Sequence, residues 1–204
     1  MIKNSQEKFW IGNFGKKYIF RNKSKIILKN NEYLFKNILE KKNFSSIIEF
    51  GSNIGNNINV LSKIVKKPKK ITAVEINKKA CEILKKKFPT IEVLNESVNK
   101  FIVKKKYELV LSKGFLIHVN PKQLPTVYKK IYNSCKKYIL ICEYYSTKPR
   151  KEDYRRHKNK LFKRDFAGEL LDRYKKLRLV KYGFVYHKDK FPQDDITWFL
   201  LKKN

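Results

Sequence analysis

The chain has 204 residues, of which 42% are hydrophobic, and 49 Lys and Arg against 18 Asp and Glu give it a formal net charge of +31. This length suits one domain with a sizeable core, and the composition excludes an intrinsically disordered chain. No apolar run approaches the roughly 18 residues of a membrane span and no signal peptide is recognisable, so we expect a soluble cytoplasmic protein without a membrane partner.

Apolar residues at helical spacing predict a helix over residues 30–41, within an N-terminal helical cover formed by residues 1–42. Short apolar runs then alternate with helical patterns. The predicted strands are residues 46–50, 71–75, 91–94, 107–111 and 138–143, and the predicted helices between them are residues 54–65, 78–88 and 121–134. A polar insertion, residues 144–174, contains one predicted helix at residues 165–174, and two strands near residues 177–186 and 196–201 follow.

This alternation predicts an α/β fold, a single domain over residues 1–204 with a doubly wound, mostly parallel seven-stranded sheet. In such sheets the ligands bind at the carboxyl ends of the strands. The insertion at residues 144–174 follows the fifth strand and is expected to form a lid over the second substrate.

An acidic residue precedes a glycine loop at the end of the first predicted strand. Glu49 stands just before Gly51 and Gly55, and Glu75 closes the second strand, 24 residues after Gly51. A carboxylate at that place can accept hydrogen bonds from both hydroxyls of a ribose. The three-glycine fingerprint of dinucleotide-binding proteins is absent, which disfavours an NAD enzyme. The arrangement resembles the nucleotide loop of S-adenosylmethionine-dependent methyltransferases, and this resemblance implies S-adenosylmethionine as the cofactor.

Four separated blocks carry a closer resemblance, which extends over almost the whole chain. They are residues 9–22 (FWIGNFGKKYIFRN), 113–121 (KGFLIHVNP), 143–145 (EYY) and 161–168 (LFKRDFAG). The chain resembles the pseudaminic acid biosynthesis-associated methylase family in these blocks. It departs from the family at Arg156, where the family has Gly. The resemblance implies a Rossmann-like methyltransferase fold, methyl transfer and an association with sugar biosynthesis.

The cofactor contacts implied by these resemblances gather at the strand ends and in the N-terminal segment. They are Tyr18, Arg21, Glu49, Gly51, Ser52, Asn53, Gly55, Asn56, Glu75, Ile76, Asn95, Glu96, Ser97, Lys113 and Gly114. Asn95 has the alternative of only turning the chain. We expect Trp10 and Phe14 to pack an aromatic helix stripe onto the core rather than to touch a ligand.

His118 and Glu143 are the candidate catalytic residues, because both follow strands at the predicted binding edge. Histidine titrates near neutrality and can remove a proton from an acceptor hydroxyl. His118 could instead cap a helix or satisfy a main-chain carbonyl. The candidate substrate-binding residues lie in and around the insertion: Tyr144, Tyr145, Tyr154, Arg155, His157, Lys163, Arg164 and Asp165.

Arginine is unevenly distributed in a chain whose basic residues are mostly lysine. There are 42 Lys and 7 Arg, and six of the Arg fall within residues 150–178. Clustered guanidinium groups suit an anionic acceptor, which we expect to be a small sugar or nucleotide-sugar methylated at O or N. The alternatives are a nucleic-acid methyltransferase that uses the basic surface and a cofactor-binding scaffold without catalysis. The three cysteines are expected to be core residues, and no metal site is expected.

Overall fold

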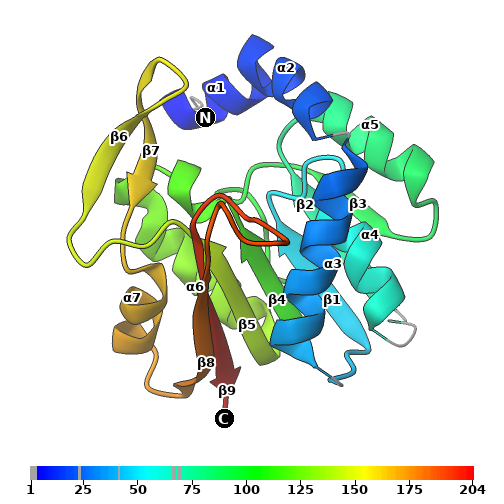
Figure 1. Cartoon of the computed structure of the whole chain (residues 1–204), viewed down its shortest axis with the longest axis vertical. Helices are drawn as coiled ribbons and strands as arrows, with labels where there is room; N and C mark the ends of the chain where they lie inside the picture. Colours follow the sequence, from blue (N-terminus) through cyan, green and yellow to red (C-terminus); the bar gives the residue numbers. More distant parts are fainter. Residues whose placement is uncertain (1–3, 23, 41, 66–67, 69) are drawn as a thin grey trace. The chain divides into compact units, whose positions relative to one another are not determined.

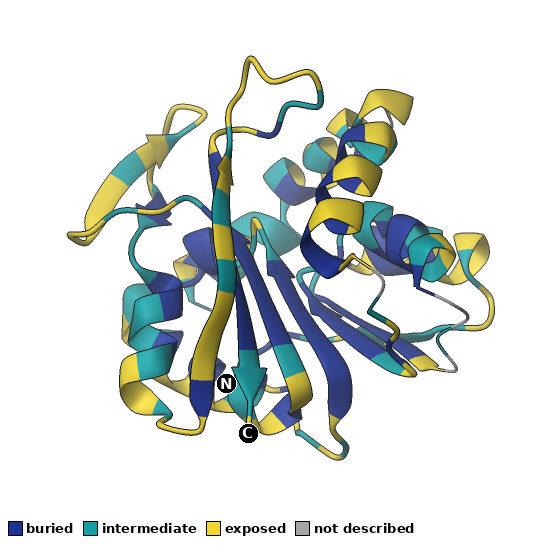
Figure 2. Ribbon diagram, turned by 60° about the horizontal axis from the view of Figure 1, so that its bottom comes forward, coloured by how far each residue is buried: buried dark blue, intermediate teal, exposed yellow. Residues whose placement is uncertain are grey.

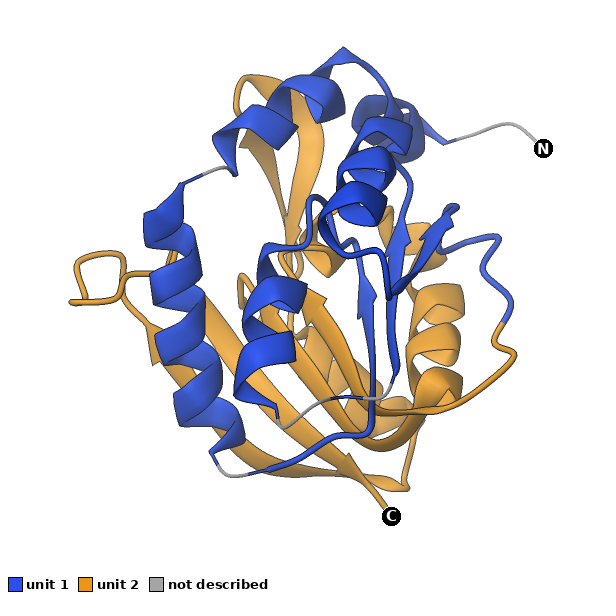
Figure 3. Ribbon diagram, turned by 90° about the vertical axis from the view of Figure 1, so that its right-hand side faces the viewer, with its two compact units in different colours: residues 1–102 blue, residues 103–204 orange. Residues whose placement is uncertain are grey.

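The computed structural model describes residues 4–22, 24–40, 42–65, 68 and 70–204 (Figure 1). Its seven-stranded sheet has the strand order β3-β2-β1-β4-β5-β9-β8, which confirms the predicted α/β fold. The chain divides into two compact units, Met1–Ile102 and Val103–Asn204 (Figure 3). The single domain predicted over residues 1–204 stays a prediction.

The first unit contains three parallel strands and five helices in the described residues. In chain order these are α1 (Ser5–Ile11), α2 (Asn13–Arg21), α3 (Lys25–Leu39), β1 (Ser46–Phe50), α4 (Asn56–Ile64), β2 (Lys70–Glu75), α5 (Lys78–Lys87) and β3 (Glu92–Asn95). β2 pairs in parallel with both β1 and β3. The third helix begins five residues earlier than predicted, because the side chain of Ser24 accepts a hydrogen bond from the amide of Ile26 and caps it there.

The second unit contains the remaining strands of the sheet and a separate hairpin. In chain order its elements are β4 (Tyr107–Lys113), η1 (Leu116–His118), η2 (Pro121–Gln123), α6 (Leu124–Ser134), β5 (Cys135–Glu143), β6 (Arg150–Tyr154), β7 (His157–Lys163), α7 (Phe166–Arg173), β8 (Leu177–Val185) and β9 (Ile196–Lys203). β4 and β5 are parallel, whereas β9 runs antiparallel to β5 and to β8.

One predicted helix is divided in the structure. Residues 121–134 were expected to form a continuous helix, but they form the 3-10 turn η2 followed by α6. Pro125 in the first turn of α6 has no amide hydrogen, so the α-helical bond to Pro121 cannot form. The side chain of Asn120 accepts a hydrogen bond from the amide of Lys122 and caps the short turn instead.

The insertion folds into a hairpin that the sequence pattern did not predict. β6 and β7 form a two-stranded antiparallel sheet of their own. The two residues between them, Arg155 and Arg156, have φ angles of 50° and 69°, as a tight hairpin turn of the I′ type requires. Arginine is an unusual residue at such angles, and the Gly or Asn that normally marks this turn is absent. The helix predicted at residues 165–174 is confirmed as α7.

The core lies along the central strands, which Figure 2 shows as buried over most of their length. Ile47, Ile48 and Phe50 of β1 are fully buried, as expected of a parallel strand covered on both faces. The three cysteines are free and buried, which confirms their interpretation as core residues. None of the helices in the described part of the chain has the length and apolar character needed to cross a membrane.

Candidate functional site

The loop after β1 turns tightly around the end of β2. The amide of Gly51 donates to the carbonyl of Val74 at 2.9 Å. Three loop residues have left-handed backbones: φ is 74° at Gly51, 46° at Asn53 and 78° at Gly55. Gly55 has a second constraint, because a Cβ there would lie 2.5 Å from Cδ2 of Leu84. The two glycines thus let the chain reverse and pass close to α5.

Glu75, the last residue of β2, holds this loop through its carboxylate. Oε2 accepts a hydrogen bond from the amide of Asn53 at 2.7 Å, and Oε1 accepts one from the amide of Asn77 at 2.7 Å. Burial raises the pKa of Glu75, and the amide hydrogen bonds oppose that rise. Each carboxylate oxygen has a second lone pair, so the group can accept further hydrogen bonds from two vicinal hydroxyls.

Glu49 is a second buried carboxylate at the end of the neighbouring strand β1. Its Oε1 accepts a hydrogen bond from Nδ2 of Asn57 on α4 at 2.6 Å, and Asn57 in turn accepts from Nδ2 of Asn31 on α3 at 2.9 Å. Ser52 donates its hydroxyl to the main-chain oxygen of Glu49 at 3.1 Å. An ionised carboxylate is an acceptor-only group, which suits a ligand that carries an ammonium group.

The residues at and just after the end of β3 contact the end of β2 and α1. Nδ2 of Asn95 donates to the carbonyls of Glu75 and Ile76, both at 3.1 Å. Asn95 therefore ties the ends of β2 and β3 together, besides any ligand contact. Ser97 donates its hydroxyl to the carboxylate of Glu7, which α1 contributes.

The N-terminal helices are attached to the same strand ends of this unit. Nδ2 of Asn77 donates to the carbonyl of Trp10 at 2.8 Å, and Nδ2 of Asn56 donates to the carbonyl of Asn22 at 2.7 Å. Together with the bond between Ser97 and Glu7, these contacts hold residues 4–22 at the carboxyl ends of β1, β2 and β3. The N-terminal cover predicted over residues 1–42 stays a prediction.

The aromatic residues of α1 and α2 form a half-buried cluster rather than a core stripe. The ring of Tyr18 meets the ring of Trp10 edge-on at 5.2 Å, and Phe14 meets Trp10 at 5.5 Å. The guanidinium of Arg21 lies 5.6 Å from the centroid of Phe14. Since Trp10, Phe14 and Tyr18 all keep partial exposure, the cluster contributes aromatic surface as well as packing.

In the second unit, Glu143 ends β5 with a buried carboxylate that binds the loop after β4. Its Oε1 accepts from the hydroxyl of Ser112 at 2.7 Å and from the amides of Phe115 and Leu116 at 3.1 and 3.0 Å. Its Oε2 accepts from the amide of Ile117 at 3.4 Å. Burial raises the pKa of Glu143, against the effect of these hydrogen bonds. The geometry makes Glu143 a residue that positions the turn leading to His118.

His118 is buried at the end of η1, and the hairpin sets its orientation. Its Nδ1 lies 2.8 Å from the main-chain oxygen of Lys160 on β7. A carbonyl oxygen can only accept, so Nδ1 carries the proton, and in the neutral ring Nε2 is the nitrogen with an acceptor lone pair. Burial lowers the pKa of His118 to about 4, although the carbonyl of Lys160 acts in the opposite direction. At neutral pH His118 is thus an uncharged imidazole with one defined tautomer.

The tip of the hairpin places three predicted substrate-binding residues near this imidazole in the same unit. The ring of Tyr154 lies 4.7 Å from the ring of His118. The guanidinium of Arg155 lies 5.7 Å from the centroid of Tyr154 and is exposed. His157 pairs with Tyr154 across the hairpin and is exposed as well. Tyr154, Arg155 and His118 form a continuous group that combines an aromatic face, a cation and a neutral base.

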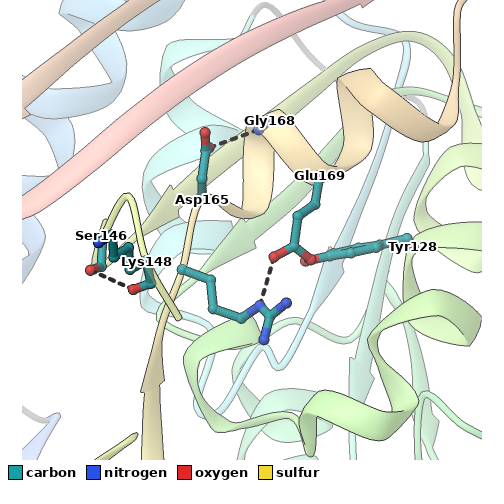
Figure 4. Close-up of polar contacts among 7 residues, drawn as sticks. Tyr128, Ser146, Lys148, Asp165, Gly168 and Glu169 are labelled. Atoms are coloured by element: carbon teal, nitrogen blue, oxygen red, sulfur yellow. Dashed lines mark hydrogen bonds and ion pairs between the residues drawn. The ribbon is translucent and has the colours of Figure 1, made fainter. Parts of the chain in front are cut away.

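Three other predicted substrate-binding residues have partners within the unit. Nε of Arg164 donates to Oε1 of Glu169 at 2.6 Å, and Oε2 of Glu169 accepts from the hydroxyl of Tyr128 at 2.9 Å (Figure 4). Asp165 caps α7 by accepting from the amide of Gly168 at 2.8 Å (Figure 4). Lys163 pairs with Glu152 across the hairpin at 2.9 Å. These contacts stabilise the insertion, whereas Arg155 remains exposed.

The remaining predicted site residues of this unit lie at or just beyond the ends of β4 and β5. Gly114 has a φ of 62°, and nothing lies within 4 Å of the position of a Cβ there. Lys113 precedes it and is half-buried. The Nζ of Lys163 lies 5.6 Å from the ring of Tyr144, and the ring of Tyr145 lies 5.9 Å from that of Phe199. Burial raises the pKa of Tyr144.

Several residues with a clear structural role were not singled out by sequence reasoning. Three have local signals. Glu7 stands three residues after Asn4 in a capping box, Asn77 caps α5, and Asn57 stands in the first turn of the helix after the glycine loop. Ser112 has no local signal, because its partner Glu143 is distant in sequence, and the contact between Glu169 and Tyr128 is likewise distant in sequence.

Residues 47–138 match a family model described as a methyltransferase domain. The matched part contains the glycine loop, Glu75 and His118. It therefore confirms the prediction of a methyltransferase, and hence of an enzyme, whereas the finer resemblance to pseudaminic acid-associated methylases is not part of this finding. The chain matches none of the curated proteins with which it was compared.

Solved structures of methyltransferases share the fold. The 1,6-didemethyltoxoflavin-N1-methyltransferase of Burkholderia thailandensis, with bound 1,6-didemethyltoxoflavin and S-adenosylhomocysteine, has a TM-score of 0.70 at 12% identity, over 98% of this chain and 87% of that chain. An S-adenosylmethionine-dependent methyltransferase of Clostridium acetobutylicum has a TM-score of 0.65 at 12% identity, over 94% and 98%. The N-methyltransferase NodS of Bradyrhizobium japonicum has a TM-score of 0.67 at 11% identity, over 89% and 98%. At these identities the likeness establishes the fold.

Proposed function

We propose that this chain transfers a methyl group from S-adenosylmethionine to O or N of a small anionic acceptor, a sugar or nucleotide-sugar. The methyltransferase domain and the fold support the transfer reaction. The anionic sugar is the finer part of the proposal. It rests on the exposed Arg155 beside Tyr154 and on the resemblance to sugar-associated methylases.

The residues of the first unit fit the chemical groups of S-adenosylmethionine, which supplies a methyl group on a sulfonium centre. Glu75 offers two carboxylate oxygens to ribose hydroxyls, and Glu49 offers a buried carboxyl group to the methionyl ammonium. The glycine loop, with positive φ at Gly51 and Gly55, brings main-chain atoms to the surface that the nucleoside would occupy. Tyr18 and Arg21 belong to the cover and are proposed to contact the cofactor from the N-terminal side.

The residues of the second unit fit the removal of a proton from the acceptor. The single observation that carries this step is the hydrogen bond from Nδ1 of His118 to the carbonyl of Lys160, which leaves Nε2 as the basic atom. Glu143 holds the η1 turn that bears the imidazole. Tyr154 would pack on the acceptor and Arg155 would bind its negative charge. Positioning of the acceptor is the larger part of catalysis in such displacements.

The transfer of a radiolabelled methyl group tests this function. The wild type is incubated with methyl-labelled S-adenosylmethionine and a panel of UDP-, GDP- and CMP-linked sugars, with a short RNA and a short DNA as competitors. We expect labelled sugar and a weak dependence on salt, because only a few charges are neutralised. Labelled RNA or DNA, with a steep loss of activity as salt rises, would favour the nucleic-acid alternative. If His118→Gln transferred the methyl group at the wild-type rate, His118 would not be the general base.

A further inference from the structure

A surface of exposed aromatic rings lies on the second unit, outside the groups described so far. Tyr182, Phe184 and Tyr186 alternate along β8 and just beyond its end, and they are 69%, 58% and 47% exposed. Tyr145, which follows β5, is 41% exposed. Together with Phe199 of β9 these residues form what we call the aromatic platform. Monomeric proteins rarely expose so many contiguous large rings without a binding role.

The strand register places the platform on one face and at one end of the sheet. Tyr182 is opposite Phe199, and their rings stack at 6.3 Å with an angle of 20° between the planes. Phe184 is opposite Thr197, which is in turn opposite Glu143, the last residue of β5. The platform therefore reaches the carboxyl end of β5, where the proposed acceptor residues of the same unit begin.

Gly183 makes this flat arrangement possible. A Cβ at Gly183 would lie 2.6 Å from the indole of Trp198, so the indole lies directly beneath the strand on the opposite face. The rings of Phe184 and Tyr186 follow at 6.5 Å with an angle of 36°. Tyr182 and Phe184 on β8 are separated by about 7 Å, the advance of two residues along a strand, and Tyr186 follows just beyond the end of β8. A row of rings at this spacing suits a ligand made of repeated flat units.

The charges around the platform distinguish between two kinds of ligand with repeated flat units, single-stranded nucleic acid and a neutral chain. Although the protein has a net charge of +31, the loop that borders the platform, residues 187–195, contains two lysines and three aspartates. Nδ1 of His187 is 2.9 Å from Oδ2 of Asp195, and Lys163 is paired with Glu152. A stacking surface for single-stranded nucleic acid is normally bordered by unpaired basic residues. The positive charges along this border are balanced by nearby carboxylates, so the platform matches a neutral ligand.

We propose that the aromatic platform binds the pyranose rings of a neutral carbohydrate chain attached to the sugar that is methylated. A pyranose ring presents an apolar face of C–H groups that packs on an aromatic ring, while its hydroxyls stay in contact with water and with the tyrosine hydroxyls. This inference rests on the proposed anionic sugar acceptor and narrows it: the methylated anionic sugar is the terminal unit of an oligosaccharide rather than a free sugar or nucleotide-sugar, and the platform holds the neutral units that follow.

Binding of neutral oligosaccharides without S-adenosylmethionine tests the platform. Cellohexaose and chitohexaose are titrated into the wild type by calorimetry and by saturation-transfer NMR, with glucose and N-acetylglucosamine as single-unit controls. Oligouridylate is titrated into the wild type and the variants in the same way, as the single-stranded nucleic-acid comparison. Tyr182→Ala and Phe184→Ala are compared with Tyr33→Ala, which removes an exposed tyrosine on α3, outside the platform. Circular dichroism verifies the fold of each variant.

We expect one of the hexasaccharides to bind at least tenfold more tightly than its monosaccharide. Each platform substitution should weaken that binding by about two- to tenfold, the usual contribution of one aromatic contact, and Tyr33→Ala should bind as the wild type does. Binding of neither hexasaccharide, equal binding by all variants, or loss of oligouridylate binding in the platform variants alone would overturn the proposal. We expect the platform variants to bind S-adenosylmethionine as the wild type does, because the substitutions lie outside the proposed cofactor residues. If the wild type itself does not bind S-adenosylmethionine, the proposed function has failed, whatever the result for the platform.

Discussion

The imidazole of His118 donates from Nδ1 to the main-chain oxygen of Lys160 at 2.8 Å, and this one bond connects the η1 turn to the β6–β7 hairpin. The same imidazole contacts the ring of Tyr154 at 4.7 Å. The orientation of the proposed base therefore depends on the hairpin that bears the proposed acceptor residues. A main-chain carbonyl has here the orienting role that a carboxylate often has toward a catalytic histidine.

Removal of the imidazole is expected to abolish transfer to a hydroxyl acceptor while cofactor binding persists. His118→Gln should lower kcat/KM by about 10²- to 10⁴-fold, the usual contribution of general base catalysis. In the wild type the activity should stay level from pH 8 down to about pH 5, because burial lowers the pKa of His118 to about 4. Steady-state kinetics across this range provide the measurement. A midpoint near pH 6.5 would show that the imidazole titrates as an exposed histidine does.

The same pKa gives a stability prediction. Since the pKa of His118 falls from 6.5 to about 4 on folding, only the unfolded chain binds this proton between these values. The contribution of His118 to the free energy of unfolding is therefore fully present above about pH 6.5 and is lost as the pH falls toward 4. At pH 5 the loss is about 2 kcal/mol, from about 1.4 kcal/mol per pKa unit. Urea unfolding of the wild type and His118→Gln at pH 7.5 and pH 5 isolates this contribution, because the buried carboxylates titrate in both. An equal pH dependence in the two proteins would contradict it.

Glu143 is expected to act through the loop that it holds. Glu143→Gln replaces one acceptor oxygen by an amide donor that faces a main-chain amide, and it should lower the free energy of unfolding by about 1 to 3 kcal/mol. It should also lower kcat while the KM for the acceptor changes little, because the η1 turn shifts. Glu108→Gln is the matched control, since Glu108 is also largely buried but its carboxylate pairs with the exposed Lys137. Full activity and full stability of Glu143→Gln would refute a positioning role.

The two arginines Arg155 and Arg164 are expected to behave differently. Arg155→Gln should raise the KM for an anionic acceptor about tenfold, which corresponds to one charge-assisted hydrogen bond, without a change in stability. Arg164→Gln should instead lower the free energy of unfolding by about 1 to 2 kcal/mol, because Glu169, which also accepts from the hydroxyl of Tyr128, loses the guanidinium of Arg164. Acceptor kinetics and thermal unfolding of both variants separate the effects. The reverse assignment would place the acceptor at Arg164.

Two glycine substitutions compare packing with backbone strain. Gly55→Ala adds a Cβ at 2.5 Å from Leu84 and 2.9 Å from Phe88, at a φ of 78°. Gly114→Ala adds one into open space at a φ of 62°. The left-handed backbone costs about 1 to 2 kcal/mol in each case, and the overpacking at Gly55 adds about 1 to 3 kcal/mol. Equal melting temperatures for the two variants would show that α5 moves aside.

The parts of the fold that were predicted from the sequence are those that local patterns determine. The apolar run at residues 46–50 ends at a glycine loop, and Glu75 ends the next strand, so strand, loop and acid are adjacent in sequence. Periodicity likewise locates most of the helices. The start of α6 was missed because Pro125, inside the predicted helix, imposes a separate turn.

The contacts that were not predicted depend on tertiary structure. The β6–β7 hairpin turns at two arginines with positive φ, where the usual turn residues are absent. Three partners of Glu143 are main-chain amides 26 to 28 residues away, and every residue type except proline offers such an amide, so the sequence does not mark them. Arg164 was predicted to bind the acceptor because it belongs to a cluster of arginines. Its ion pair with Glu169 forms because α7 brings the two side chains together, and the sequence alone does not show this.

Calorimetric titration of S-adenosylmethionine and S-adenosylhomocysteine tests the central claim most directly. We predict micromolar binding to the wild type and to Glu92→Gln, which changes a carboxylate at the other end of the same strand pair. Glu75→Ala and Glu75→Gln should weaken binding at least tenfold, with circular dichroism confirming their fold. Absence of binding to the wild type, or binding that does not depend on Glu75, would contradict the cofactor site described for this protein.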